Sequence, residues 1–436
     1  MTRPLTGLLL VLLSVLLGCG GSGEPSAPVA GADAVSAPAP TPSPTPDPPP
    51  SPAPPPATDP PVPTPAPVPA PPPAAEPEPI GPGRLENAAM LNRVSAAAVA
   101  AAIADAALAG ERVPVVNPVY EVVNHRLTYL TVDGQGRTVA ASGLVSVPVK
   151  TAGARSPVIS YQHGTTFKDA EAPSNHAVAS EPAVVMASLG YIVVAPDYVG
   201  YGASKGMEHP YLLSAPSASA VLDLLTAAKS WRRSNGIADN GQLFLAGYSE
   251  GGYVTVAAHR AMQTGNSVHL ATLVTAVPGA GPYHLGVTMD ELLRRVKDDH
   301  PVLGALISPG FLKNLGSTVR NEVRRLLLRL IIPDGADVTL QTTFLDTYMA
   351  DDDDAMERQS NVHDWKPDAP VSLYHGRDDQ TVPYASATRT LQAMQARTAP
   401  QVSLTDCPAT PSDHLPCVVP YWTFMLAQLS GWARDL

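Results

Sequence analysis

Short apolar runs alternate with helix-prone runs from residue 158 to residue 432, and this alternation constrains the fold more than any other feature. The apolar runs are residues 158–161, 191–194, 243–245, 273–277, 371–374 and 402–404. The helix-prone runs are residues 217–231, 250–262, 385–396 and 418–432. Alternation of this kind is typical of parallel sheets that helices cover on both faces. We therefore expect an α/β fold with a mostly parallel, twisted sheet flanked by helices.

The segment that precedes this pattern has a different character. Residues 127–132 and 138–142 alternate in polarity around a turn of sequence Asp-Gly-Gln-Gly at 133–136. A glycine-rich turn between two such runs predicts an antiparallel hairpin at the start of the sheet. Residues 85–108 are rich in alanine, and we expect them to form a helix packed outside the sheet.

Residues 281–367 interrupt the alternation and are helical in pattern. Residues 290–296 and 319–331 are amphipathic, and residues 344–348 are suited to another helical turn. An insertion after the strand at 273–277 lies over the carboxyl edge of the sheet, where ligands bind, so we interpret it as a helical cap or lid. The alternative is a fixed packing layer. The acidic run at 351–354 is interpreted as a solvated face rather than a calcium site.

Proline dominates the chain from residue 25 to residue 82, which holds about half of the 49 Pro. Proline lacks an amide proton and fixes φ, so this composition forms no core and favours extended polyproline II or disorder. We predict a linker over residues 19–83, acting either as a stalk or as a plain spacer. Residues 84–436 are then one globular domain of ordinary composition.

The first eighteen residues resemble the signal peptide of a bacterial lipoprotein. Arg3 is followed by an apolar stretch at 5–17 and then by Leu-Leu-Gly-Cys at 16–19. The stretch is too short for a permanent membrane helix. The resemblance implies cleavage after residue 18 and lipidation of Cys19, which exports the protein and anchors it to the cell envelope, at the outer membrane or cell surface. A plain signal peptide is the alternative.

The remaining cysteines, Cys407 and Cys417, form one pair. In an exported chain such a pair is expected to form a disulfide, and two free thiols are the alternative. The net charge of −11, without a basic patch, argues against nucleic acid as a partner and against electrostatic docking on anionic lipid. The membrane contact is then the lipid on Cys19. Neither metal-ligand spacing nor a phosphate-binding loop is found, so we expect no cofactor and no metal.

Residues 247–251 read Gly-Tyr-Ser-Glu-Gly between the apolar run at 242–246 and the helix-prone run at 252–259. This is the pattern of a nucleophile elbow, in which glycines flank a serine on a strained turn between a strand and a helix. Ser249 is therefore the candidate nucleophile. The alternative is a serine in an ordinary turn.

Several further motifs accompany the elbow. They are Gln-His-Gly-Thr-Thr at 162–166, Val-Ala-Pro-Asp-Tyr-Val-Gly-Tyr-Gly at 194–202, His-Pro-Tyr at 209–211 and His-Gly-Arg-Asp-Asp-Gln-Thr-Val-Pro at 375–383. With these motifs the chain from about residue 96 to residue 436 resembles the secreted lipase and esterase branch of the α/β-hydrolase superfamily, and is similar to the secretory lipases. The resemblance implies the α/β-hydrolase fold, with the cap as an insertion in it.

The resemblance also implies roles for individual residues. In this superfamily the nucleophile, the acid and the base follow one another along the chain. Asp379 matches the acid of the motif at 375–383, in preference to its neighbour Asp378, and His414 lies in the loop that holds the base. The amides of Thr165 and Glu250 match the two donors of an oxyanion hole.

We therefore expect a serine carboxylester hydrolase, a lipase or esterase acting on a small-molecule or lipid ester through an acyl-enzyme. The same constellation serves serine peptidases, acyltransferases and feruloyl or polyester-cleaving esterases. Outside the enzymes, the alternative is a tethered binding lipoprotein on an inactive hydrolase scaffold.

Overall fold

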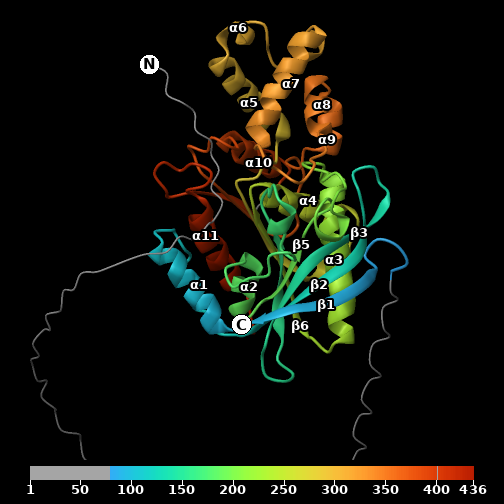
Figure 1. Ribbon diagram of the computed structural model, residues 1–436, viewed down its shortest axis with the longest axis vertical. Coiled ribbons are helices and arrows are strands. Elements are labelled where there is room, and N and C mark those ends of the chain that lie inside the picture. The colour runs from blue at the N-terminus through green and yellow to red at the C-terminus, as the bar shows by residue number, and fades with distance from the viewer. Residues whose placement is uncertain (1–78, 400) are drawn as a thin grey trace, which may run out of the picture. The chain divides into compact units, whose positions relative to one another are not determined.

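A computed structural model describes residues 79–399 and 401–436 of the protein. Its central element is the sheet seen in the middle of Figure 1. This sheet has nine strands in the order β1-β2-β3-β5-β4-β6-β7-β8-β9. The strands are β1 (Leu85–Val94), β2 (Val122–Val132), β3 (Thr138–Pro148), β4 (Ser156–Gln162), β5 (Ile192–Pro196), β6 (Asp239–Tyr248), β7 (Leu273–Gly279), β8 (Val371–His375) and β9 (Val402–Asp406). Strands β1, β2, β3 and β5 pair antiparallel, and from β5 to β9 every pair is parallel. The predicted fold class and the hairpin are confirmed.

Helices cover both faces of the sheet. They are α1 (Ala96–Leu108), α2 (Pro182–Ser188), α3 (Ser214–Ser234), α4 (Glu250–Thr264), α10 (Tyr384–Ala396) and α11 (Val418–Ser430). Figure 1 shows α3 and α4 on one side and α1, α2 and α11 on the other. Strand β6 shows why both faces of the sheet are covered, because its apolar residues alternate between the two faces. Leu243 and Leu245 belong to the core that contains α3 and α4, whereas Phe244 and Ala246 belong to the core that contains α2 and α11.

The expectation of a helix over residues 85–108 is wrong for its first part. Residues 85–94 form β1, which pairs antiparallel with β2 at the edge of the sheet, and the helix begins only after Ser95, whose side chain accepts a hydrogen bond from Ala98 N. The gain from hydrogen bonding to the open edge of β2 outweighs the helix propensity of the alanines. Contact with the sheet begins two residues before β1, where Gly83 N donates to Leu130 O of β2 at 2.8 Å.

The segment between β7 and β8 consists of helices and connecting loops, and we call it the insertion (residues 281–367). Its helices are α5 (Leu285–Asp299), α6 (Pro301–Gly304), α7 (Ser317–Ile331), α8 (Thr343–Met349) and α9 (Asp353–Gln359), drawn in gold and orange in Figure 1. Both long helices are amphipathic: α5 buries Leu292, Leu293 and Val296, and α7 buries Val323 and Leu327. The insertion begins where β7 ends, at the carboxyl edge of the sheet.

The acidic run at 351–354 has a structural role at the start of α9. Asp352 caps this helix by accepting a hydrogen bond from Ala355 N at 2.9 Å, and Asp351 accepts one from Lys313 N at 2.9 Å. Acidic side chains in the first turn of a helix also interact favourably with its dipole. Within residues 79–399 and 401–436, no three His, Cys, Asp or Glu side chains are placed to hold a metal ion.

The predicted signal peptide, Cys19 and nearly all of the predicted linker lie outside the described residues. Among the helices in the described part of the chain, none combines the length and the apolar character needed to cross a membrane.

Candidate active site

The turn between β6 and α4 places Ser249 at its apex, in a backbone conformation that residues other than glycine rarely adopt. Ser249 has φ 61° and ψ −125°, and its N–H donates to Gly279 O at 2.9 Å. A Cβ on Gly251 would lie 2.0 Å from Gln162 O, and one on Gly247 would lie 2.4 Å from Gly251 O. Close backbone approach therefore requires glycine at both positions. Backbone strain like that of Ser249 concentrates at functional sites. This is the geometry of a nucleophile elbow.

Three of the residues singled out in the sequence form one continuous series of hydrogen bonds. Ser249 Oγ lies 2.8 Å from His414 Nε2, and His414 Nδ1 lies 2.7 Å from Asp379 Oδ2. An ionised carboxylate only accepts hydrogen bonds, so the proton of the neutral imidazole lies on Nδ1. His414 Nε2 is then free to accept the proton of Ser249. The elements that supply these residues are the β6–α4 turn, the loop after β8 and the loop before α11.

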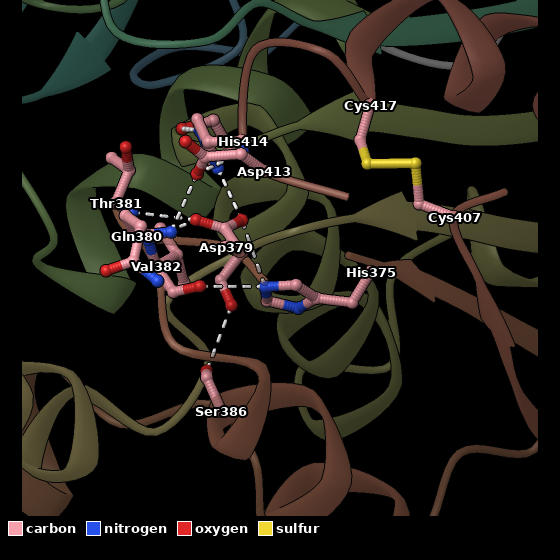
Figure 2. A network of polar contacts seen from close by, with 12 residues as sticks. His375, Asp379, Gln380, Thr381, Val382, Ser386, Cys407, Asp413, His414 and Cys417 are labelled. Atoms are coloured by element: carbon pink, nitrogen blue, oxygen red, sulfur yellow. Dashed lines mark hydrogen bonds and ion pairs between the residues drawn. A yellow bond between two sulfur atoms is a disulfide. The ribbon is translucent and has the colours of Figure 1, made fainter. Parts of the chain in front are cut away.

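Asp379 is buried and surrounded by donors (Figure 2). Its Oδ1 accepts from Thr381 N and Val382 N, both at 2.8 Å, and its Oδ2 contacts His414 Nδ1 and, at 3.2 Å, His375 Nε2. Burial by itself raises the pKa of a carboxyl group, but the neighbouring His375 and His414 side chains outweigh it and hold the pKa of Asp379 well below its ordinary value. The carboxyl group of Asp379 is therefore an anion at neutral pH. A negative charge there can stabilise His414 when its imidazole takes up a proton.

The neighbouring Asp378 has a different position. It accepts hydrogen bonds from Ser412 N and Ser412 Oγ, both at 2.9 Å, and these bonds lower the pKa of its carboxyl group. Asp379, and not Asp378, contacts His414. Asp378 instead ties the loop after β8 to the loop that carries His414.

The loop that carries His414 is closed by a covalent bond. Cys407 and Cys417 form a disulfide with a sequence separation of 10 residues, as predicted. Cys407 N donates to His375 O at 2.9 Å, and Tyr248 OH donates to His414 O at 2.8 Å. The bridge, visible beside His375 in Figure 2, and these hydrogen bonds hold the position of His414.

The two amides that the sequence assigned to an oxyanion hole have no partner in the described part of the chain. Neither Thr165 N nor Glu250 N donates a hydrogen bond to another protein group there. Thr165 follows Gly164, and a Cβ on Gly164 would lie 3.2 Å from Tyr248 O and 3.7 Å from Ser249 Cβ. The loop after β4 thus passes close beside the elbow. Unpaired N–H groups at such a place suit an oxygen that becomes negative.

The side chain of Glu250 takes part in a buried pair that sequence reasoning missed. Glu250 Oε1 lies 2.6 Å from His209 Nε2, and the two side chains are 1% and 2% exposed. His209 Nδ1 donates to Val199 O at 2.9 Å, and the backbone of His209 forms an isolated bridge with Leu340 of the insertion. The motif around His209 was recognisable, but no signal in the sequence pairs two positions 41 residues apart.

Comparison with known proteins places these features in a family context. A model of the secretory lipase family matches residues 173–303, which include the elbow and the first part of the insertion. No curated protein matches the chain. The family match confirms the resemblance to the secretory lipases and supports an ester hydrolase.

Solved structures show the fold. The rice cell wall degrading esterase LipA from Xanthomonas oryzae is 23% identical and has a TM-score of 0.62, with 81% of this chain and 100% of that one covered. A putative hydrolase from Legionella pneumophila is 23% identical, with a TM-score of 0.61 and coverage of 80% and 98%. Candida antarctica lipase A is 18% identical, with a TM-score of 0.50 and coverage of 82% and 84%. The likeness shows an α/β-hydrolase fold.

Proposed function

We propose that this chain is a serine carboxylester hydrolase, a lipase or esterase that forms an acyl-enzyme on Ser249. The observation that carries the proposal is the series of hydrogen bonds from Asp379 through His414 to Ser249, at the apex of a strained elbow. A serine hydroxyl is a poor nucleophile unless a base accepts its proton, and this series supplies both the base and the group that orients it.

The reaction follows from these positions. Ser249 Oγ attacks the ester carbonyl while its proton passes to His414 Nε2, and Asp379 stabilises the imidazolium that results. The N–H groups of Thr165 and Glu250 donate to the carbonyl oxygen as it becomes an oxyanion, each lowering the barrier by about 3 kcal/mol. His414 then protonates the leaving alcohol. Water repeats the sequence on the acyl-enzyme and releases the carboxylic acid.

The same residues carry out acyl transfer in peptidases, acyltransferases and feruloyl or polyester-cleaving esterases. The match to the secretory lipase family favours carboxylic esters among these substrates. The complete hydrogen-bonded series and the unpaired amides favour an enzyme over an inactive binding scaffold. We accordingly propose an ester substrate, either a small molecule or a lipid, and a reaction that needs no cofactor.

We propose that the insertion shapes the substrate pocket. Thr165 Oγ1 lies 3.1 Å from Tyr211 OH, and the ring of Tyr211 packs edge-on against Phe344 of α8 with centroids 5.7 Å apart. The insertion therefore reaches the proposed oxyanion loop through two contacts. A panel of p-nitrophenyl esters from acetate to palmitate tests this: Phe344→Ala should change the preferred chain length, and an unchanged preference contradicts a role in the pocket. Because LipA degrades rice cell wall, cell-wall esters belong in the panel.

The direct test of the proposed nucleophile is Ser249→Ala in the full chain. We expect p-nitrophenyl butyrate hydrolysis to fall by at least about 10³-fold, because the acyl-enzyme does not form. Ser234→Ala is the matched control, since Ser234 is an exposed serine whose hydroxyl bonds only to Ser230 O on α3. Hydrolysis at the wild-type rate in Ser249→Ala contradicts the proposal.

The secretory lipase match suggests an exported protein, and we propose that lipid on Cys19 anchors it to the cell envelope. The Leu-Leu-Gly-Cys sequence at 16–19 supports this proposal. Cys19→Ala should move the protein from the membrane fraction to the soluble fraction. An unchanged distribution contradicts an anchor at this position.

A further inference from the structure

His375 is the last residue of β8, and its side chain is fully buried beside the proposed acid. It takes no part in the proton transfer from Ser249 to His414. A buried histidine needs hydrogen-bond partners for both of its ring nitrogens, and leaving one of them without a partner costs free energy. The contacts of the two nitrogens of His375 are therefore informative.

The two nitrogens have different surroundings. Nε2 lies 2.9 Å from Val382 O and 3.2 Å from Asp379 Oδ2, and Figure 2 marks both contacts with dashed lines. Both neighbours are acceptors, so Nε2 carries a hydrogen atom. Nδ1 is buried without any partner. A proton there would be an unpaired buried donor on a cation, so the neutral ring with hydrogen on Nε2 fits the site.

Asp379 Oδ2 is consequently shared by two imidazoles. His414 donates to it from Nδ1, and His375 Nε2, whose N–H donates to Val382 O, lies 3.2 Å from it. The N–H of His375 therefore lies beside Oδ2, next to the donor of His414. It also stabilises the ionised carboxylate, so that the proton remains on His414 when the imidazolium forms.

We propose that His375 is a positioning residue of the catalytic site, which holds Asp379 ionised and oriented toward His414 through its Nε2–H. Phenylalanine would fill the same volume but would place no N–H beside Asp379 Oδ2 and Val382 O. The inference rests on the proposed function, since it assigns His375 to the machinery that includes Ser249.

The test compares two substitutions at this position in the full chain. His375→Phe removes the donor and keeps the volume, whereas His375→Gln retains an N–H at a position equivalent to Nε2. We expect His375→Phe to lower kcat by about 10- to 100-fold with KM within about twofold, because binding of the ester does not involve this residue. His375→Gln should restore kcat to within about fivefold of the wild-type value.

His259→Phe is the matched control. His259 is a fully buried histidine on α4, neither of its ring nitrogens has a partner, and it packs edge-on against Trp365. Its replacement removes a buried imidazole without removing a hydrogen bond. We expect kcat of this variant to stay within about threefold of the wild-type value. A loss as large as that of His375→Phe shows a packing effect and overturns the proposal.

The pH profile supplies a reading that packing alone does not change. The other titratable groups around the two imidazoles are the carboxylates of Asp379 and Asp413, the hydroxyls of Tyr248 and Tyr384, and the outer ion pair of Arg377 with Asp406. Without the donor from His375, the carboxylate interacts more strongly with the proton of His414. The acid limb of the kcat/KM profile should move to higher pH by about 0.5 unit in His375→Phe.

Two further results from the variants overturn the inference: wild-type kcat with an unmoved acid limb in folded His375→Phe, or an equal loss of kcat in both variants at position 375. If His375→Phe does not fold, ¹⁵N NMR of histidine-labelled wild-type protein decides the question. Hydrogen on Nε2 of His375 supports the inference, and hydrogen on Nδ1 overturns it. The NMR reading needs no turnover, so it separates failure of this inference from failure of the proposed ester hydrolysis.

Discussion

Removal of the Cys407–Cys417 disulfide tests how the loop that carries His414 is held. The perturbation is the double substitution Cys407→Ala and Cys417→Ala. The bridge joins residues 10 apart in the sequence, and the chain-entropy relation for a loop of that length gives about 3 kcal/mol of stabilisation. Unfolding entropy is about 2 cal/mol/K per residue, or about 0.7 kcal/mol/K for roughly 350 residues, so the melting temperature should fall by about 4 °C.

Activity at 25 °C should change much less than stability. The loop remains tied to the loop after β8 by the hydrogen bonds from Ser412 to Asp378 and by Gln380 N, which donates to Asp413 Oδ1 at 2.8 Å. Tyr248 OH still donates to His414 O. These bonds remain formed in the folded protein, so we expect kcat within about threefold of the wild-type value.

The assay combines differential scanning fluorimetry with initial rates of p-nitrophenyl butyrate hydrolysis at 25 °C. Ser412→Ala is the comparison, because it removes hydrogen bonds to Asp378 and leaves the disulfide intact. An unchanged melting temperature in the double variant refutes the entropic argument. Loss of activity at 25 °C with the fold retained refutes the claim that hydrogen bonds suffice to place His414.

Three further substitutions test the site and the fold. Gly251→Ala puts a Cβ 2.0 Å from Gln162 O, so it should lower the free energy of unfolding measured in urea by about 2 kcal/mol or more. Gly81→Ala is the control, because no atom lies within 4 Å of its added Cβ. Equal urea midpoints for the two variants contradict the argument. Asp379→Asn should lower kcat by about 10⁴-fold because His414 adopts the wrong tautomer, and a loss below tenfold in folded protein excludes Asp379 as the acid. Burial raises the pKa of Asp223 to about 6, so its contribution to stability is full below about pH 4 and is lost as pH rises through about 6. Asp223→Asn should therefore raise the melting temperature at pH 8 and much less at pH 4.5, and an equal effect at both pH values contradicts the assignment.

Sequence reasoning singled out the residues of the candidate site because the informative signals are local. A glycine-flanked serine between an apolar run and a helix-prone run predicts a strained turn from a few neighbouring residues. Asp379 and His414 were found in the same way, from a motif and from the order of elements along the chain. The distances of 2.7 Å and 2.8 Å that join them to one another and to Ser249 came only with the fold.

What the sequence left out depends on contacts between distant parts of the chain. Residues 85–94 form a strand because β2 offers an open edge, which no local propensity reveals. The Glu250–His209 pair joins an elbow residue to a loop near the insertion. The orientation of His375 toward Asp379 requires knowledge of where Val382 O lies. Each of these features is decided by tertiary packing, which overrides or supplements local preference.

The central claim, a covalent acyl-enzyme on Ser249, is tested most directly by mapping the site of reaction with a fluorophosphonate. The intact protein is labelled at pH 8, digested, and sequenced by tandem mass spectrometry. We predict one phosphonyl adduct, on Ser249, whose rate of formation falls in Asp379→Asn and vanishes in Ser249→Ala. An adduct on another residue, or the absence of an adduct from protein that hydrolyses esters, contradicts the account.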